Sequence, residues 1–248
     1  VEEFSYVRTR TAHPVKVTLP SPTMYAYYWL PRVSDRAYPS PEVYLEEVAR
    51  LIGEEVDELV RRGATYLQFD APEFGMLLDP HQQRWFAEKG FPAEWTIRRG
   101  VELINDIIRA HSGVTFGLHI CRGNDASRYM AKGSYAAIAR TILGRVEADR
   151  LLLEYDDERS GDFEPLREVP EDKVVVLGLV TTKWPREETE GELMTRIDEA
   201  SQYIALDRLA LSTQCGFASV ARGNAITPEV QADKLNLVAR VASRVWEA

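Results

Sequence analysis

Short apolar runs recur along the chain, and longer stretches in which apolar residues have helical spacing separate them. Most of the short runs are continuous in valine, leucine and isoleucine, without alternation of apolar and polar residues. Such continuity is typical of strands that are buried on both faces of a parallel sheet. The pattern predicts strands at residues 15–19, 66–69, 115–120, 150–154, 173–180 and 209–212.

The stretches between these runs predict helices, and two of them carry clear capping signals. Ser40-Pro41-Glu42 supplies an N-cap, a proline at the first helical position and an acid in the first turn, and Gly63 supplies a stop. Thr227-Pro228-Glu229 opens the last helix in the same way. Helical spacing predicts one helix between Ser40 and Gly63 and others at residues 94–110, 134–146, 190–204 and 228–246.

Regular alternation of strand and helix leaves two architectures, a doubly wound sheet and a closed (β/α)8 barrel. No Gly-rich phosphate loop follows any predicted strand, which weakens the nucleotide-binding, doubly wound alternative. Six βα units are predicted, whereas a barrel needs eight, so a barrel would require further units on the N-terminal side.

Composition narrows the class of partner. The formal net charge is −9 and no basic run offsets it, whereas a nucleic-acid surface needs clustered lysine and arginine. The longest apolar stretch, residues 174–180, is far shorter than the roughly 20 residues that cross a bilayer. Two cysteines do not make a disulfide framework, so the cytoplasm is the expected compartment. We therefore expect neither a nucleic-acid nor a membrane partner.

Residues with metal-binding side chains follow several of the predicted strands. His119 and Cys121 are two positions apart at the end of one strand, so their side chains point to the same side. Glu154 and Cys215 occupy equivalent places after later strands, and such strand ends meet at the face of a barrel where active sites lie. Two thiolates, an imidazole and a carboxylate suit zinc. Each residue alone has a structural explanation, such as a packed cysteine, but one metal site accounts for all four.

Five short motifs, taken in order, resemble the catalytic barrel of the cobalamin-independent methionine synthase family. Residues 67–72 (LQFDAP) are similar to its IQIDEP strand, and residues 117–124 (GLHICRGN) are similar to its HxC strand. Residues 151–154 (LLLE) are similar to the strand that carries its glutamate ligand. Residues 178–183 (GLVTTK) take the place of the next strand, and residues 211–216 (LSTQCG) resemble its NPDCG turn.

The resemblance implies an α/β fold, a (β/α)8 TIM barrel in a single catalytic domain over residues 1–248, with the first one or two βα units before Val1. The zinc ligands that it implies are His119, Cys121, Glu154 and Cys215. Asp70 would hold the amino group of the thiol substrate, and Gln68 in the same strand is interpreted as a packing residue. Lys183 stands where the family has a proton-transferring histidine, which makes it a catalytic candidate beside Asp70. The residues expected to contact substrate are Asp70, Ser21, Tyr28, Trp29 and Asn124.

The activity that the resemblance implies is zinc-dependent transfer of a methyl or other alkyl group to a substrate thiol, with homocysteine or a related thiol as acceptor. A zinc enzyme that forms or cleaves C–S bonds of another thiol is one alternative. A metal-free barrel enzyme resembling uroporphyrinogen decarboxylase and a non-catalytic zinc-binding protein are the others. The expected partners are a small-molecule thiol and an alkyl donor, and homo-oligomerisation is left open.

Overall fold

The computed structural model describes residues 1–247, in which six strands form one parallel sheet with the strands in sequential order. The strands are β1 (Lys16–Pro20), β2 (Tyr66–Asp70), β3 (Thr115–Ile120), β4 (Arg150–Glu154), β5 (Val174–Val180) and β6 (Leu209–Thr213). All six strands predicted from the apolar runs are confirmed, and every strand end agrees to within one residue. Parallel pairing in sequential order places every carboxyl end at the same edge of the sheet.

Helices connect the strands and cover the outer face of the sheet. The longer ones are α2 (Pro41–Arg61), α5 (Ala93–Arg109), α6 (Glu190–Ser201) and α7 (Pro228–Trp246). The shorter ones are α1 (Glu2–Arg8), α3 (Pro72–Met76) and α4 (Pro80–Glu88), with 3-10 turns η1 (Pro22–Tyr28), η2 (Ser34–Arg36), η3 (Tyr135–Ala137), η4 (Glu158–Ser160), η5 (Glu164–Glu168) and η6 (Leu206–Arg208). The predicted caps are present: the Ser40 hydroxyl accepts from the Val43 amide, and Thr227 caps α7.

The predicted helix at residues 134–146 is wrong. This segment contains only η3 followed by irregular turns, and the amide of Gly144 bonds to the carbonyl of Ala139, five residues back. Tyr135 explains the departure, because its buried hydroxyl donates to the Ile120 carbonyl (2.6 Å) and accepts from the Glu154 amide (2.9 Å). The side chain thus fastens the segment to two strand ends and holds it in a course that a regular helix would not follow.

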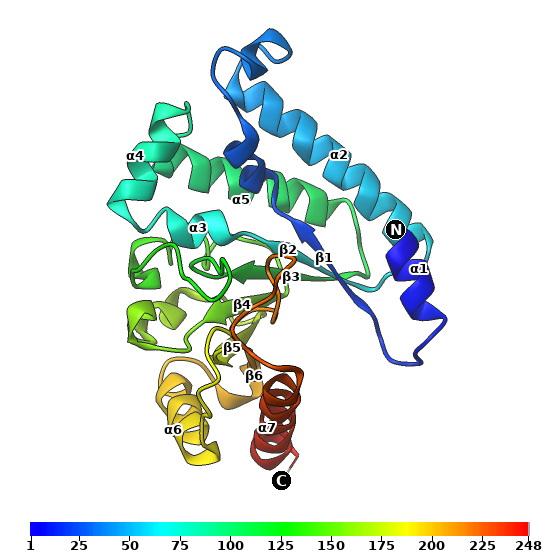
Figure 1. The fold of residues 1–248 in the computed structure, drawn as a ribbon. Coiled ribbons are helices and arrows are strands. Elements are labelled where there is room, and N and C mark those ends of the chain that lie inside the picture. Colours follow the sequence, from blue (N-terminus) through cyan, green and yellow to red (C-terminus); the bar gives the residue numbers. More distant parts are fainter. Residues whose placement is uncertain (248) are drawn as a thin grey trace.

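The sheet is that of a (β/α)8 barrel, and it is not closed among the described residues, where β1 and β6 form its two edges. Figure 1 shows α2 and α5 near the β1 end of the sheet and α6 and α7 beside β5 and β6. The single-domain organisation, with further βα units before Val1, stays a prediction. No helix in residues 1–247 combines the length and the apolarity needed to cross a membrane.

Side chains alternate between the two faces of each strand, as shown by β2. Leu67 and Phe69 are fully buried, and Phe69 stacks on Phe116 of β3 with ring centroids 5.9 Å apart. Gln68 and Asp70, on the other face, line a cavity. The fold therefore pairs an apolar layer under the helices with a polar inner face that opens at the carboxyl ends of the strands.

Candidate metal centre

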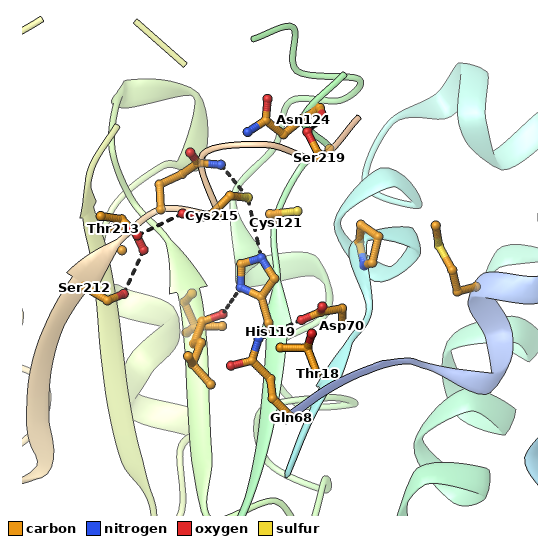
Figure 2. Close-up of a pocket in the computed structure, with 18 of the residues that line it drawn as sticks. Thr18, Gln68, Asp70, His119, Cys121, Asn124, Ser212, Thr213, Cys215 and Ser219 are labelled. Carbon is orange, nitrogen blue, oxygen red and sulfur yellow. Dashed lines mark hydrogen bonds between the residues drawn. The ribbon is translucent and has the colours of Figure 1, made fainter. Parts of the chain in front are cut away.

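A cavity of about 620 Å³ lies at the carboxyl ends of the strands, where a barrel carries its active site. Every strand of the sheet, or the loop that follows it, contributes to its wall. The lining residues with functional side chains include Asp70, His119, Cys121, Asn124, Gln214 and Cys215. Figure 2 shows the two cysteines above His119, with Asp70 beside it.

His119, Cys121 and Cys215 form a compact cluster of side chains of the kinds that bind metal ions. One ligand atom from each lies within 4.8 Å of those of the other two, and the His119 Nε2 to Cys215 Sγ distance is 3.5 Å. His119 Nδ1 lies 3.2 Å from the carbonyl oxygen of Leu152, where it can only donate. In the neutral ring, which is the form that binds a metal, that contact places the proton on Nδ1 and leaves the Nε2 lone pair facing the two sulfurs.

The electrostatics of the cluster favour a bound cation. A hydrogen bond from Cys215 and the nearby imidazole lower the pKa of Cys121 well below its ordinary value. The pKa of Cys215 is raised well above its ordinary value, because its thiol donates a hydrogen bond to Cys121 and because burial and the charge of Cys121 disfavour a second thiolate. Burial would lower the pKa of His119, but the Cys121 sulfur and the carboxylates of Asp70 and Glu154 outweigh burial and raise it to about 9. A buried cysteine sulfur, a half-buried one and an imidazole therefore fit a borderline-soft cation such as zinc.

Glu154, the fourth predicted ligand, lies next to the cluster but is not one of the three grouped donors. The carboxylate is fully buried, with Arg159 Nη2 3.0 Å from Oε1 and Lys183 Nζ 3.4 Å from Oε2. Burial would raise its pKa, but Lys183, Arg159 and Arg122 outweigh burial and lower it. Lys183, predicted as catalytic, is itself fully buried behind Glu154 and does not line the cavity.

Asp70 reaches the cavity at the same level as His119, its partner in the register of β2 and β3. Its Oδ1 accepts a hydrogen bond from Gln68 Nε2 (2.7 Å), and Gln68 Oε1 accepts from Lys16 Nζ (2.7 Å). The interpretation of Gln68 as a packing residue is therefore wrong, since it lines the cavity and orients Asp70. Alternation along β2 was the available signal, because it places Gln68 and Asp70 on one face.

Of the other predicted substrate contacts, only Asn124 lines the cavity, whereas Ser21, Tyr28 and Trp29 lie outside its wall. Asn124 lines the cavity, and its Nδ2 donates to Thr182 Oγ1 (3.4 Å). Ser21 is fully buried, caps η1 and donates to Glu73, outside the cavity wall. Trp29 packs against Tyr44 and Phe91, and Tyr28 points to solvent with 69% of its surface exposed. From η1 the cavity wall contains Met24 instead, a residue that no motif in the sequence marks.

A protein-family model and several known proteins are similar in sequence to this chain. The family model described as cobalamin-independent synthase, catalytic domain, matches residues 7–236. Uncharacterized protein YxjH of Bacillus subtilis (strain 168) is 36% identical over 233 residues, which cover 93% of this chain and 61% of that protein. Methionine synthase of Pyrococcus abyssi is 26% identical over 223 residues, which cover 90% of this chain and 56% of that protein.

A solved structure shares the fold at lower sequence identity. The B12-independent methionine synthase from Shewanella sp. W3-18-1, in complex with selenomethionine, matches with a TM-score of 0.76 and 23% identity. The match covers 99% of this chain and 66% of that one. The chain thus spans between 56% and 66% of the length of these three relatives.

Proposed function

This chain belongs to the cobalamin-independent synthase catalytic-domain family, and from that premise we propose that it transfers a methyl or other alkyl group to a substrate thiol, with homocysteine or a related thiol as acceptor. The observation that carries the proposal is the convergence of His119, Cys121 and Cys215 at the cavity. The Shewanella relative supports the choice of acceptor, because selenomethionine is the selenium analogue of the methylated product of homocysteine.

His119, Cys121 and Cys215 would hold zinc, with Glu154 as the fourth and most easily displaced donor. When bound, zinc lowers the pKa of a coordinating thiol so that it is a thiolate near neutral pH. The two cysteine sulfurs and a carboxylate make the site electron-rich, which keeps a thiolate nucleophilic toward the donor carbon. A carboxylate is a harder donor than sulfur or imidazole, which is why Glu154 is the donor expected to give way.

The residues of β2 would bind and orient the acceptor. One oxygen of Asp70 is held by Gln68, and the other can accept a hydrogen bond from the ammonium group of an amino-acid thiol. Because Asp70 is level with His119 in the sheet, an acceptor anchored at Asp70 can direct its sulfur to the cluster. Lys183 would act through Glu154, whose Oε2 lies 3.4 Å from its Nζ, and not by direct contact with the cavity.

Elemental analysis of the purified protein tests the metal site. We expect about one zinc per chain in the wild type and little or none in Cys121→Ser or Cys215→Ser, because each variant removes a thiolate ligand. Ser212→Ala is the matched control: Ser212 lies on β6 and lines the same cavity, but its hydroxyl donates to a backbone carbonyl. Loaded wild type should then convert homocysteine and a methyl donor to methionine. A folded, freshly reduced wild type without zinc would contradict the proposal and return attention to a metal-free barrel enzyme.

A further inference from the structure

Gln214 connects the cluster of sulfurs to Glu154. It directly precedes Cys215 and is buried, with 1% of its surface exposed. Its Nε2 lies 2.9 Å from Glu154 Oε2 and 2.7 Å from Cys215 Sγ, so one amide group donates to both acceptors. Its Oε1 accepts from Thr182 Oγ1 (2.9 Å), which fixes the orientation of the amide.

Both oxygens of the Glu154 carboxylate have hydrogen-bond or ion-pair partners in this position. Arg159 binds Oε1, while Lys183 and the Arg122 amide, the latter at 3.3 Å, approach Oε2 together with Gln214. A buried carboxylate is costly unless it is paired and hydrogen-bonded, so it can leave a metal only for a position that supplies such partners. The surroundings of Glu154 supply them beside the cluster.

Zinc held by His119, Cys121 and Cys215 would accept one further donor, for which Glu154 and the substrate thiol would compete. We propose that Gln214 is a positioning residue that holds the Glu154 carboxylate in a docked position beside the cluster and so frees that place for the substrate thiol. This inference rests on the proposed function.

The identity of residue 214 matters for this role. The side chain at this place has to donate to a carboxylate and to a sulfur at once. An aspartate has no donor to offer Glu154 and would add a negative charge beside it. The glutamine amide supplies the donor without a charge, which suits a residue that must bind a carboxylate and a sulfur together.

Titration of cobalt-loaded protein with L-homocysteine, followed by sulfur-to-cobalt charge-transfer absorption, tests the proposal. Gln214→Leu should weaken homocysteine binding by about tenfold or more, because a buried carboxylate loses a charge-assisted hydrogen bond in the thiol-bound state. The affinity for zinc, measured by chelator competition, should fall by a smaller factor than the affinity for homocysteine, since all the metal ligands are retained and only the hydrogen bond to Cys215 Sγ is lost. Gln214→Met keeps about the length of the side chain and has no hydrogen-bond donor, so it is the second variant, and it should weaken homocysteine binding in the same way.

Asn105→Leu is the matched control. Its amide is also buried and makes two backbone contacts, to the Arg145 carbonyl and the Glu147 amide, on α5 outside the cavity wall. It should lower stability and leave homocysteine binding unchanged. Wild-type homocysteine affinity in both Gln214 variants, or equal losses of zinc and homocysteine affinity, would overturn the role assigned to Gln214. A wild type that binds zinc but no thiol would instead contradict the proposed function.

Discussion

Glu73 illustrates how a single residue can matter for the candidate site without lining it. Its Oε1 accepts hydrogen bonds from Ser21 and from Thr23 (2.7 Å), which joins η1 to α3. Its Oε2 is buried with no partner among the described residues. An ionised carboxylate is costly in such a place, and burial raises the pKa of Glu73 to about 7. The protonated acid is therefore the form that suits the fold.

The pH dependence of stability should reveal this group. The pKa of Glu73 rises from its ordinary value of 4.5 to about 7 on folding, so between these pH values the folded state holds a proton that the unfolded state has lost. The contribution of Glu73 to stability is therefore present below this window and is lost as the pH rises through it. Relative to the isosteric Glu73→Gln, the wild type should lose on the order of 3 kcal/mol of unfolding free energy across the window. Urea unfolding of both proteins at pH 5 and pH 7.5 measures the difference. An equal difference in unfolding free energy between the two proteins at both pH values would show that Glu73 is ionised in the folded state.

At the scale of elements, the contact between α3 and the end of β3 sets the shape of the face that carries the candidate metal site. A Cβ at Gly75 would lie 2.0 Å from the carbonyl oxygen of Cys121, so only glycine allows this approach of helix to strand end. The cavity wall contains Pro72 and Met76 of α3 together with Cys121. The place of the Cys121 sulfur therefore depends on how closely α3 packs.

Gly75→Ala should displace α3 and cost about 1–3 kcal/mol of unfolding free energy, as overpacking of a tight contact does. Zinc affinity should fall as well, because the displaced backbone carries Cys121. Gly53→Ala is the control: a Cβ there meets nothing within 4 Å, and alanine in the middle of α2 should stabilise by up to about 1 kcal/mol. Urea denaturation and chelator competition test both variants. Unchanged zinc affinity in Gly75→Ala would mean that α3 does not position Cys121.

At the scale of the whole molecule, the cluster joins distant parts of an open sheet. His119 belongs to β3 and Cys215 follows β6, and the two residues are 96 positions apart in the sequence. The strands β4 and β5 lie between these two in the sheet. A cation bound by both His119 and Cys215 would therefore hold the ends of β3 and β6 together across β4 and β5. Its binding should stabilise the folded chain as a whole.

Zinc should raise the melting temperature of the protein. At a free concentration of 100 times the dissociation constant, a ligand that binds only the folded state adds about 2.7 kcal/mol. For a chain of this size that corresponds to an increase of about 5 to 10 °C in the midpoint of thermal unfolding. Thermal unfolding followed by circular dichroism, with zinc and with a chelator, measures the shift. An equal shift in Cys215→Ser would assign the effect to zinc bound elsewhere.

The sequence by itself determined the strands, the caps of α2 and α7 and the local pairing of His119 with Cys121. These features follow from short-range periodicity: continuous apolar runs, helical spacing and the two-residue repeat that places both side chains on one side of a strand. The order of the sheet then follows from the alternation of strands and helices, which is why Cys215 could be expected near His119 before the structure placed it there.

Only the tertiary structure decided which partners surround those side chains. The contacts of Gln214 and Arg159 with Glu154, the burial of Ser21 and the irregular course of residues 134–146 arise where loops without periodicity meet. A loop side chain has no spacing rule that names its distant neighbour, because the neighbour is set by packing and by the need to satisfy buried polar groups. For this reason the donors of the cluster could be predicted from the sequence, whereas the residues that orient them could not.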